Sequence, residues 1–283
     1  MQNIGLVLEG GGMRGLYTAG VLEYFLEKQL FFPYVIGVSA GACMAATYLS
    51  RQKGRNKKVN TSLVKDPRYL SLRNLIFKRQ LFGMDFLFDD IPNRVVPFDY
   101  DTFNQGKERF LVGATCCHTG EAVFFDKADH SENILQIIRA SSSLPFVAPP
   151  VSYHGKLLLD GGLVDPIPIK KSQHDGNIKN VVVMTKAENF RRKPSKFASL
   201  AKITYRSYPA IYDLLQKRHE VYNDTLSCIE EEEQHGRTFV IKPSIELPVG
   251  RIERNEKNLI ALYELGYNDA KEKWTSLNQF LSQ

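Results

Sequence analysis

The sequence Gly37-Val38-Ser39-Ala40-Gly41 stands between an apolar run, residues 33–36, and a helix-like run, residues 42–49. A serine between two glycines at a strand-to-helix step is typical of a nucleophile elbow. Glycine on both flanks allows the tight turn and leaves the serine hydroxyl exposed. The alternative is an ordinary turn in which Ser39 caps the following helix. Ser39 is therefore a candidate nucleophile whose role depends on the rest of the chain.

The composition indicates an ordinary globular protein. The 283 residues are 43% hydrophobic and 24% charged, which suits a chain with a full core. No apolar run approaches the roughly 18 residues of a membrane span, and the start, Met1-Gln2-Asn3-Ile4, lacks a secretory signal, so we expect a cytoplasmic protein. The four cysteines show neither a disulfide framework nor zinc spacing. Strands that alternate with helices, without a linker, predict a single α/β domain over residues 1–283.

Glycines also follow the first predicted strand, residues 4–9. The loop Gly10-Gly11-Gly12-Met13-Arg14-Gly15 leads into a helix with apolar residues at helical spacing. Two successive strand–helix units therefore place both glycine turns at the carboxyl ends of strands, where parallel sheets bind ligands. Free N–H groups at a helix N-terminus stabilise negative charge, so the loop is a candidate oxyanion hole, with Gly11, Gly12 and Met13 as donors. Arg14 adds a positive charge suited to a phosphate or carboxylate.

The same loop also fits the dinucleotide fingerprint Gly10-x-Gly12-x-x-Gly15. That site needs an acidic residue about 20 positions on, at the end of the second strand. Here that strand ends in Gly37-Val38-Ser39, and Glu23 and Glu27 lie in the helix. A P-loop is excluded, because Leu16-Tyr17 stand where lysine and serine or threonine are required. The oxyanion interpretation fits best, and a non-catalytic lipid- or nucleotide-binding protein is the alternative.

A serine nucleophile needs a base. The usual base is histidine, but none of the six histidines stands in a glycine-rich or strand-end setting; they are His118, His130, His154, His174, His219 and His235. Asp160-Gly161-Gly162 instead follows a three-leucine strand, although Asp-Gly is also a common turn. Asp160 could take the Ser39 proton directly. A Ser-Asp-His triad is disfavoured because the α/β-hydrolase fold places several strands before its elbow and only one precedes it here.

In this order, the loop at residues 10–15, the elbow and Asp160-Gly161-Gly162 resemble the oxyanion loop, nucleophile elbow and catalytic aspartate of the patatin-like phospholipase family. The match covers about residues 4–185, and residues 139–145 also resemble a family segment near the site. The resemblance implies a three-layer α/β fold with a mostly parallel central sheet flanked by helices. It further implies a Ser39–Asp160 dyad that hydrolyses phospholipids or related acyl esters, with no metal and no cofactor.

Two features depart from many family members. Asp165-Pro166 stands where these members have Asp-Asn, which affects the local turn but not Asp160. The more helical part after about residue 190 differs from the plant storage-protein form and is more similar to a bacterial subgroup. The resemblance therefore leaves the substrate open.

Basic and aromatic residues occur together in two stretches. Residues 69–90 interleave large apolar side chains with Arg73, Lys78 and Arg79, which is typical of core helices or of a cover over an acyl-binding cleft. Residues 191–206 hold six basic residues and no acidic ones: Arg191, Arg192, Lys193, Lys196, Lys202 and Arg206. With a net charge of +6, these stretches suit peripheral contact with an anionic membrane surface. We expect helices at residues 198–233 and 255–281, and no nucleic-acid partner.

Overall fold

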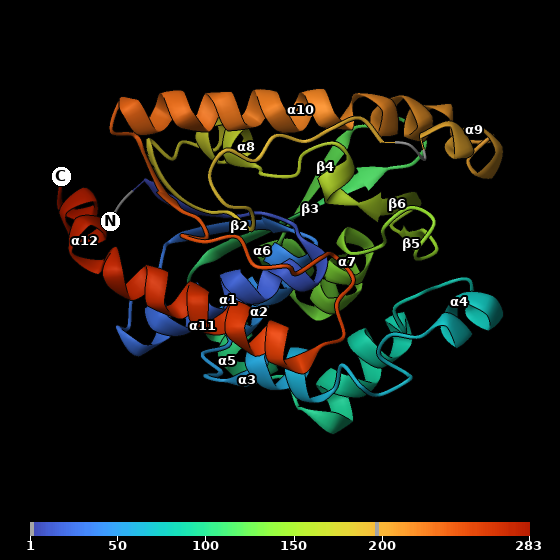
Figure 1. The fold of residues 1–283 in the computed structure, drawn as a ribbon, viewed down its shortest axis with the longest axis horizontal. Helices are drawn as coiled ribbons and strands as arrows, with labels where there is room; N and C mark the ends of the chain where they lie inside the picture. The colour runs from blue at the N-terminus through green and yellow to red at the C-terminus, as the bar shows by residue number, and fades with distance from the viewer. Residues whose placement is uncertain (1–2, 196–197) are drawn as a thin grey trace.

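A mostly parallel sheet runs through the middle of the molecule (Figure 1). The computed structural model describes residues 3–195 and 198–283. The strands of this part of the chain are β1 (Ile4–Leu8), β2 (Tyr34–Val38), β3 (Arg109–Cys116), β4 (Ala122–Asp126), β5 (Val151–Tyr153), β6 (Lys156–Asp160), β7 (Lys179–Val183) and β8 (Thr238–Ile241). Their order is β5-β6-β3-β2-β1-β7-β8, with β4 beside β3. The neighbours from β3 to β8 run parallel, whereas β4, β5 and β6 join antiparallel.

Helices cover both faces of the sheet (Figure 1). One face carries α1 (Gly15–Glu27), α2 (Ala40–Leu49), α7 (Ile134–Ser141) and α11 (Glu256–Glu272), and the other carries α8 (Ile169–His174) and α10 (Pro209–Gln234). The shorter helices are α3 (Arg55–Lys57), α4 (Leu72–Lys78), α5 (Tyr100–Gln105), α6 (Lys127–His130), α9 (Ala201–Thr204) and α12 (Trp274–Ser282). The segment Phe86–Val95 is a π-helix. The predicted three-layer α/β architecture is confirmed.

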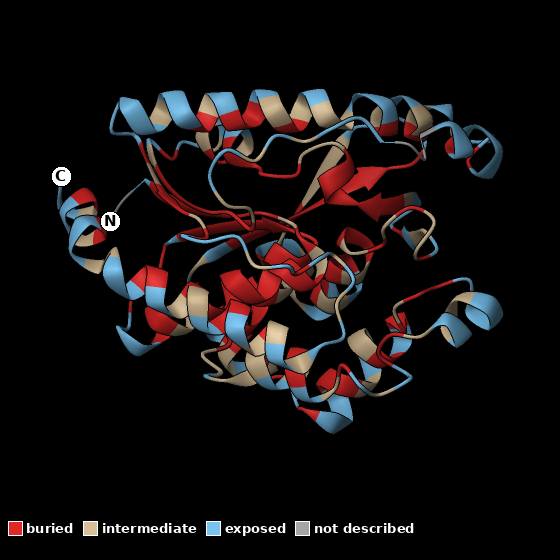
Figure 2. Cartoon of the chain, in the orientation of Figure 1, coloured by how far each residue is buried: buried red, intermediate tan, exposed pale blue. Residues whose placement is uncertain are grey.

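Side chains of the central strands alternate between two cores. Leu6 and Leu8 of β1 pack with the helices of one face, and Val7 packs with Tyr222 and Leu226 of α10 on the other. Successive residues of a strand point to opposite faces, so a strand buried on both faces is a continuous apolar run. Figure 2 shows the resulting concentration of buried residues in the sheet and on the inner faces of the helices.

The C-terminal part completes the same sheet and one of its helical layers. Strand β8 pairs with β7, and α11 packs closely against α1. A Cβ atom added to Gly20 would collide with the carbonyl oxygen of Tyr263, and one added to Gly266 would collide with that of Tyr17. The hydroxyl of Tyr17 donates to Asp269 at 2.9 Å and fixes the register of the two helices.

Replacing Gly266 with alanine is expected to destabilise the fold by about 1–3 kcal/mol or more, because the added methyl group pushes α11 away from α1. The measurement is the midpoint of thermal or urea unfolding. Asn268→Ala, at an exposed position of the same helix, is the matched control. It is expected to leave stability unchanged or slightly raised, because alanine is the better helix former. Equal stability of the two variants would contradict the close packing.

Two helices and one strand differ from the sequence-based expectation. The single helix predicted over residues 198–233 is wrong, because α9 and α10 are separate and residues 205–208 lie between them. Pro209 begins α10, and a residue before proline avoids helical geometry, which Tyr208 does with φ −136° and ψ 69°. The C-terminal helix is likewise divided at Lys273. Strand β5 has no counterpart in the prediction, and Lys196 of the basic stretch lies outside the described residues.

Candidate active site

Ser39 lies between β2 and α2 in a backbone conformation that residues other than glycine rarely adopt, with φ 53° and ψ −125°. Its flanks leave no room for side chains. A Cβ atom at Gly37 would lie 2.9 Å from the backbone of α2, and one at Gly41 would lie 2.5 Å from the carbonyl oxygen of Leu8. The Ser39 side chain makes no capping hydrogen bond to α2. The turn therefore has the sharp geometry expected of an elbow, and helix capping does not explain the serine.

Ser141, at the end of α7, holds this turn in place. The backbone N–H of Ser39 donates to Oγ of Ser141 at 2.7 Å, and this hydroxyl donates to the carbonyl oxygen of Gly113 at 2.6 Å. Ser141 is fully buried, so both bonds are shielded from water. Sequence reasoning noted residues 139–145 as a family-like segment but assigned Ser141 no role, because its partners lie in β3 and the elbow.

Asp160 ends β6 and is almost completely buried, with 1% of its surface exposed. Its backbone N–H donates to the carbonyl oxygen of Ser143 at 2.9 Å, and its carbonyl oxygen accepts from Thr115 at 2.8 Å. The carboxylate atom Oδ1 accepts from the N–H of Gly162 at 2.8 Å. Oδ2 is buried and has no hydrogen-bond partner of good geometry among the described residues.

The surroundings of Asp160 act on its acidity. Burial raises the pKa of the carboxyl group, and the nearby charge of Arg218 and the side chain of Ser39 oppose this rise. Ser39 and Asp160 line the same small cavity. Gly161 allows the close approach of β6 to β3, because a Cβ atom there would collide with the backbone of Gly113.

The glycine loop supplies fewer free donors than the sequence suggested. The N–H of Gly10 donates to the carbonyl oxygen of Pro166 at 3.3 Å, and the N–H of Met13 donates to that of Arg251 at 3.1 Å. The expectation that Met13 contributes an oxyanion donor is therefore wrong. Gly11 and Gly12 make no N–H hydrogen bond within the part of the chain that the structure describes, and both line a small cavity with Ser39 and Asp160.

Arg14 and Gly15, the last residues of the glycine loop, do not line the cavity that holds Asp160. The side chain of Arg14 is buried and lines a separate cavity with Thr185 and Lys186, so it does not face Ser39. Burial lowers the pKa of its guanidinium group. Gly15 begins α1 and permits close packing on α2, where a Cβ atom would lie 2.7 Å from that of Ala40.

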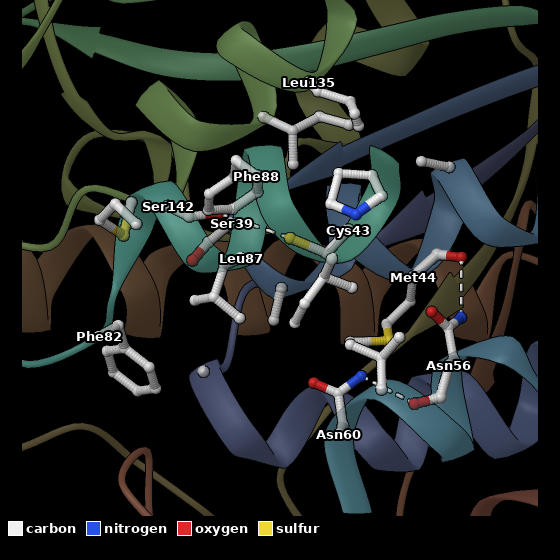
Figure 3. Close-up of a pocket in the computed structure, with 18 of the residues that line it drawn as sticks. Ser39, Cys43, Met44, Asn56, Asn60, Phe82, Leu87, Phe88, Leu135 and Ser142 are labelled. Atoms are coloured by element: carbon white, nitrogen blue, oxygen red, sulfur yellow. Dashed lines mark hydrogen bonds between the residues drawn. The ribbon is translucent and has the colours of Figure 1, made fainter. Parts of the chain in front are cut away.

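Ser39 lies between two cavities of opposite character. The larger, of about 140 Å³, is lined mostly by apolar side chains, which include residues of α2, of the π-helix Phe86–Val95 and of α7 (Figure 3). Residues 69–90 contribute part of its wall rather than covering the sheet; the contributing side chains are Tyr69, Phe82, Met84, Leu87 and Phe88. The smaller cavity, of about 10 Å³, contains Asp160, the glycine loop and three arginines, Arg192, Arg218 and Arg251. Sequence reasoning did not connect these arginines with the site.

Other candidate nucleophiles and bases are either too weakly acidic or lie away from the two cavities. Cys43 lines the larger cavity beside Ser142, with 3.6 Å between Sγ and Oγ, but burial raises the pKa of its thiol to about 11. None of the six histidines lines either cavity, so the triad alternative has no base at Ser39. Among the described residues, no group of three His, Cys, Asp or Glu side chains is placed to hold a metal ion.

Comparison with known proteins assigns the chain to a family. A family model for patatin-like phospholipases matches residues 6–171, more than half of the sequence. The chain belongs to the patatin-like phospholipase family. Its elbow, glycine loop and Asp160 all fall within the matched residues. A second family model, a domain of unknown function (DUF6363), matches residues 208–282.

Relatives of this patatin-like chain include an uncharacterized protein and several lysophospholipases. YjjU of Escherichia coli K12 is 30% identical over 85% of this chain and 68% of its own length. Lysophospholipase NTE1 of Candida albicans is 22% identical over 99% of this chain, and the NTE1 of Saccharomyces cerevisiae is 29% identical over 62%. The chain spans only 21% and 10% of these two enzymes. The crystal structure of VipD from Legionella pneumophila aligns with a TM-score of 0.49 at 12% identity, over 98% of this chain and 67% of that one.

Proposed function

We propose that this protein is a lipid acyl hydrolase that cleaves carboxylic ester bonds of phospholipids or lysophospholipids through an acyl-enzyme on Ser39. The observation that carries the proposal is the position of Ser39. It stands on a strained turn next to the buried carboxylate of Asp160 and opens onto an apolar cavity. Membership of the patatin-like phospholipase family and similarity to proteins named lysophospholipase support a lipid substrate.

The reaction follows from the groups around Ser39. Asp160 takes the hydroxyl proton through Oδ2 as Oγ of Ser39 attacks the ester carbonyl carbon. The N–H groups of Gly11 and Gly12 stabilise the oxyanion, and collapse of the tetrahedral intermediate expels the alcohol, which takes the proton from Asp160. Asp160 then removes a proton from water, the water oxygen attacks the acyl-enzyme, and the fatty acid leaves as Ser39 regains its proton. The pKa of Asp160, raised by burial, brings this base closer to neutral pH.

The test of this proposal is release of fatty acid from lysophosphatidylcholine and from a soluble p-nitrophenyl ester. Wild type is compared with Ser39→Ala. Hydrolysis by wild type alone is the expected result. Hydrolysis by both proteins would move the chemistry away from Ser39, and hydrolysis by neither would favour the non-catalytic lipid-binding alternative.

The same proposal includes a membrane-contacting surface at α4. Leu72, Ile76 and Phe77 are 71%, 73% and 78% exposed, which is unusual for large apolar side chains. Arg73, Lys78 and Arg79 flank them and complement anionic headgroups. The helix projects from the body of the molecule (Figure 1). It is followed by Phe82, which pairs with Leu70 and lines the apolar cavity. No helix of residues 3–195 and 198–283 is long and apolar enough to span a membrane.

Replacing Ile76 and Phe77 together with serine is expected to lower binding to vesicles by about tenfold or more, since two large side chains no longer enter the apolar layer. The measurement is co-sedimentation with vesicles of phosphatidylcholine that contain phosphatidylglycerol. Ile178→Ser, at a 67% exposed position before β7, is the matched control. Unchanged binding of the double variant would contradict the proposed surface. Wild-type binding that does not depend on the phosphatidylglycerol content of the vesicles would contradict it as well.

A further inference from the structure

Three arginines that the proposed reaction does not use meet beside Ser39 and Asp160. Arg192 follows β7, Arg218 belongs to α10, and Arg251 lies between β8 and α11, yet all three line the same small cavity. They lie beyond the residues matched by the patatin-like model. The C-terminal part of the chain therefore adds cationic side chains to a site whose nucleophile comes from the N-terminal part.

One of these arginines is fixed by a hydrogen bond of its side chain, and none of the three forms an ion pair among the described residues. Nε of Arg218 donates to the carbonyl oxygen of Gly162 at 2.8 Å. The guanidinium group of Arg192 lies 4.3 Å from the centre of the Tyr222 ring, and its buried Nε has no hydrogen-bond partner among the described residues. The backbone of Arg251 is positioned by its carbonyl oxygen, which accepts a hydrogen bond from the N–H of Met13. The ion pairs of the described chain involve other arginines, namely Arg51, Arg68, Arg94, Arg109, Arg139, Arg191 and Arg237.

The balance of charge in this region is positive. Burial, together with the neighbouring arginines, lowers the pKa of Arg218 to about 9 and that of Arg192 to about 10. The carboxylates that oppose this are Asp160, which acts on Arg218, and Glu9, which acts on Arg192. Glu9 already accepts hydrogen bonds from Thr185 and Tyr222. A bound anion would relieve the repulsion among the arginines.

The two cavities meet at Gly12, Ser39 and Leu144, which line both of them. An ester whose acyl chain fills the apolar cavity therefore directs its alcohol portion toward the arginines. We propose that Arg192, Arg218 and Arg251 bind a phosphate group on the alcohol portion of the substrate, so that esters of phosphorylated alcohols are preferred over neutral esters. The inference rests on the proposed function. Guanidinium groups suit this task because their planar donors match phosphate oxygens.

The dimensions of the cavity add one requirement. Its volume of about 10 Å³ is the space of about one water molecule. A phosphate group therefore enters as the long side chains of the half-buried Arg192 and Arg251 turn outward. Arg218 remains as the fixed wall, because it is bonded to the backbone of Gly162.

The experiment compares two substrates that differ only in the phosphate, 1-oleoyl lysophosphatidic acid and 1-oleoyl glycerol. The ratio of their kcat/KM values is measured for wild type, Arg192→Gln, Arg251→Gln and the charge-conserving Arg192→Lys. Each glutamine variant is expected to lower the ratio by about tenfold or more, as for a lost hydrogen bond to a charged group. Arg192→Lys is expected to restore part of the ratio. Arg191→Gln is the matched control, because its side chain is exposed and pairs with Glu230.

A second measurement separates the phosphate site from the hydrolase activity. Inorganic phosphate is added to the Ser39→Ala protein, and the melting temperature is compared with that in chloride of equal ionic strength. Stabilisation by phosphate that disappears when Arg192→Gln is added supports the site even if no ester is hydrolysed, in which case only the proposed function fails. Hydrolysis with equal ratios in all variants overturns the headgroup subsite, even if free phosphate binds. Ratios lowered equally by Arg191→Gln overturn it as well.

Discussion

Ser39→Ala is expected to reduce kcat for ester hydrolysis by about 10⁴-fold or more, because the acyl-enzyme cannot form without Oγ. Residual turnover would come from the oxyanion donors and from substrate binding. The fold should be unaffected, because the Ser39 contact that holds the turn uses the backbone N–H and the hydroxyl of Ser141. Fatty-acid release and the melting temperature are measured together. Ser227→Ala, at an exposed position of α10, controls for loss of a serine elsewhere.

Covalent labelling adds a direct readout of the nucleophile. A fluorophosphonate is expected to modify Ser39 in wild type and to leave Ser39→Ala unmodified. The thiol of Cys43 lines the same cavity, but its pKa of about 11 keeps it protonated and unreactive at neutral pH. Modification of Cys43, or full activity of Ser39→Ala, would overturn the assignment of Ser39.

Asp160→Asn is expected to reduce kcat by about 10³- to 10⁴-fold while the protein stays folded. Asparagine can still accept the hydrogen bond from Gly162, but it cannot take the Ser39 proton. The stability of the variant separates a catalytic from a structural role. Burial raises the pKa of Asp160 in the folded state, so its ionised form costs stability at any pH above the folded-state value. The melting temperature of Asp160→Asn at neutral or higher pH should therefore match or exceed that of wild type.

The pH dependence gives the corresponding kinetic test. The base form of Asp160 disappears as the pH falls through its raised pKa, so kcat/KM of wild type should decline on the acid side at a pH above the ordinary value of 3.8. The residual activity of Asp160→Asn should lack this decline. A decline that persists in Asp160→Asn would assign the base to another group, and a large fall in melting temperature would indicate a structural role.

The parts of the fold that the sequence predicted well are local. Strands β1 and β2 are short runs buried on both faces, and the leucines of β6 and the valines of β7 form further apolar runs. The glycines of the elbow are required by backbone geometry within a few residues of Ser39. Such features depend on neighbouring residues alone. The helix over residues 198–233 was mispredicted because its periodicity passed over Pro209, whose effect on the preceding residue ends the helix there.

The candidate site likewise has features that the local sequence predicts and features that it does not. The positions of the candidate nucleophile Ser39, of the carboxylate of Asp160 and of the glycine loop were predictable from glycine-rich turns at strand ends. The hydrogen bond that occupies the N–H of Met13 could not be predicted, because its partner is the carbonyl oxygen of Arg251 in a distant loop. The contacts of Ser141 and the positions of Arg192, Arg218 and Arg251 could not be predicted either, because they depend on segments far apart in the sequence.

The sequence by itself determined the α/β fold and the two turns that carry Ser39 and Asp160, because apolar runs and glycines act through local backbone geometry. Only the tertiary structure decided which N–H groups stay free, which serine secures the elbow and which arginines face it. Hydrogen-bond partners and buried charges are set by segments that the sheet brings together from far apart in the chain. The same packing sets an apolar cavity on one side of Ser39 and a cationic cavity on the other.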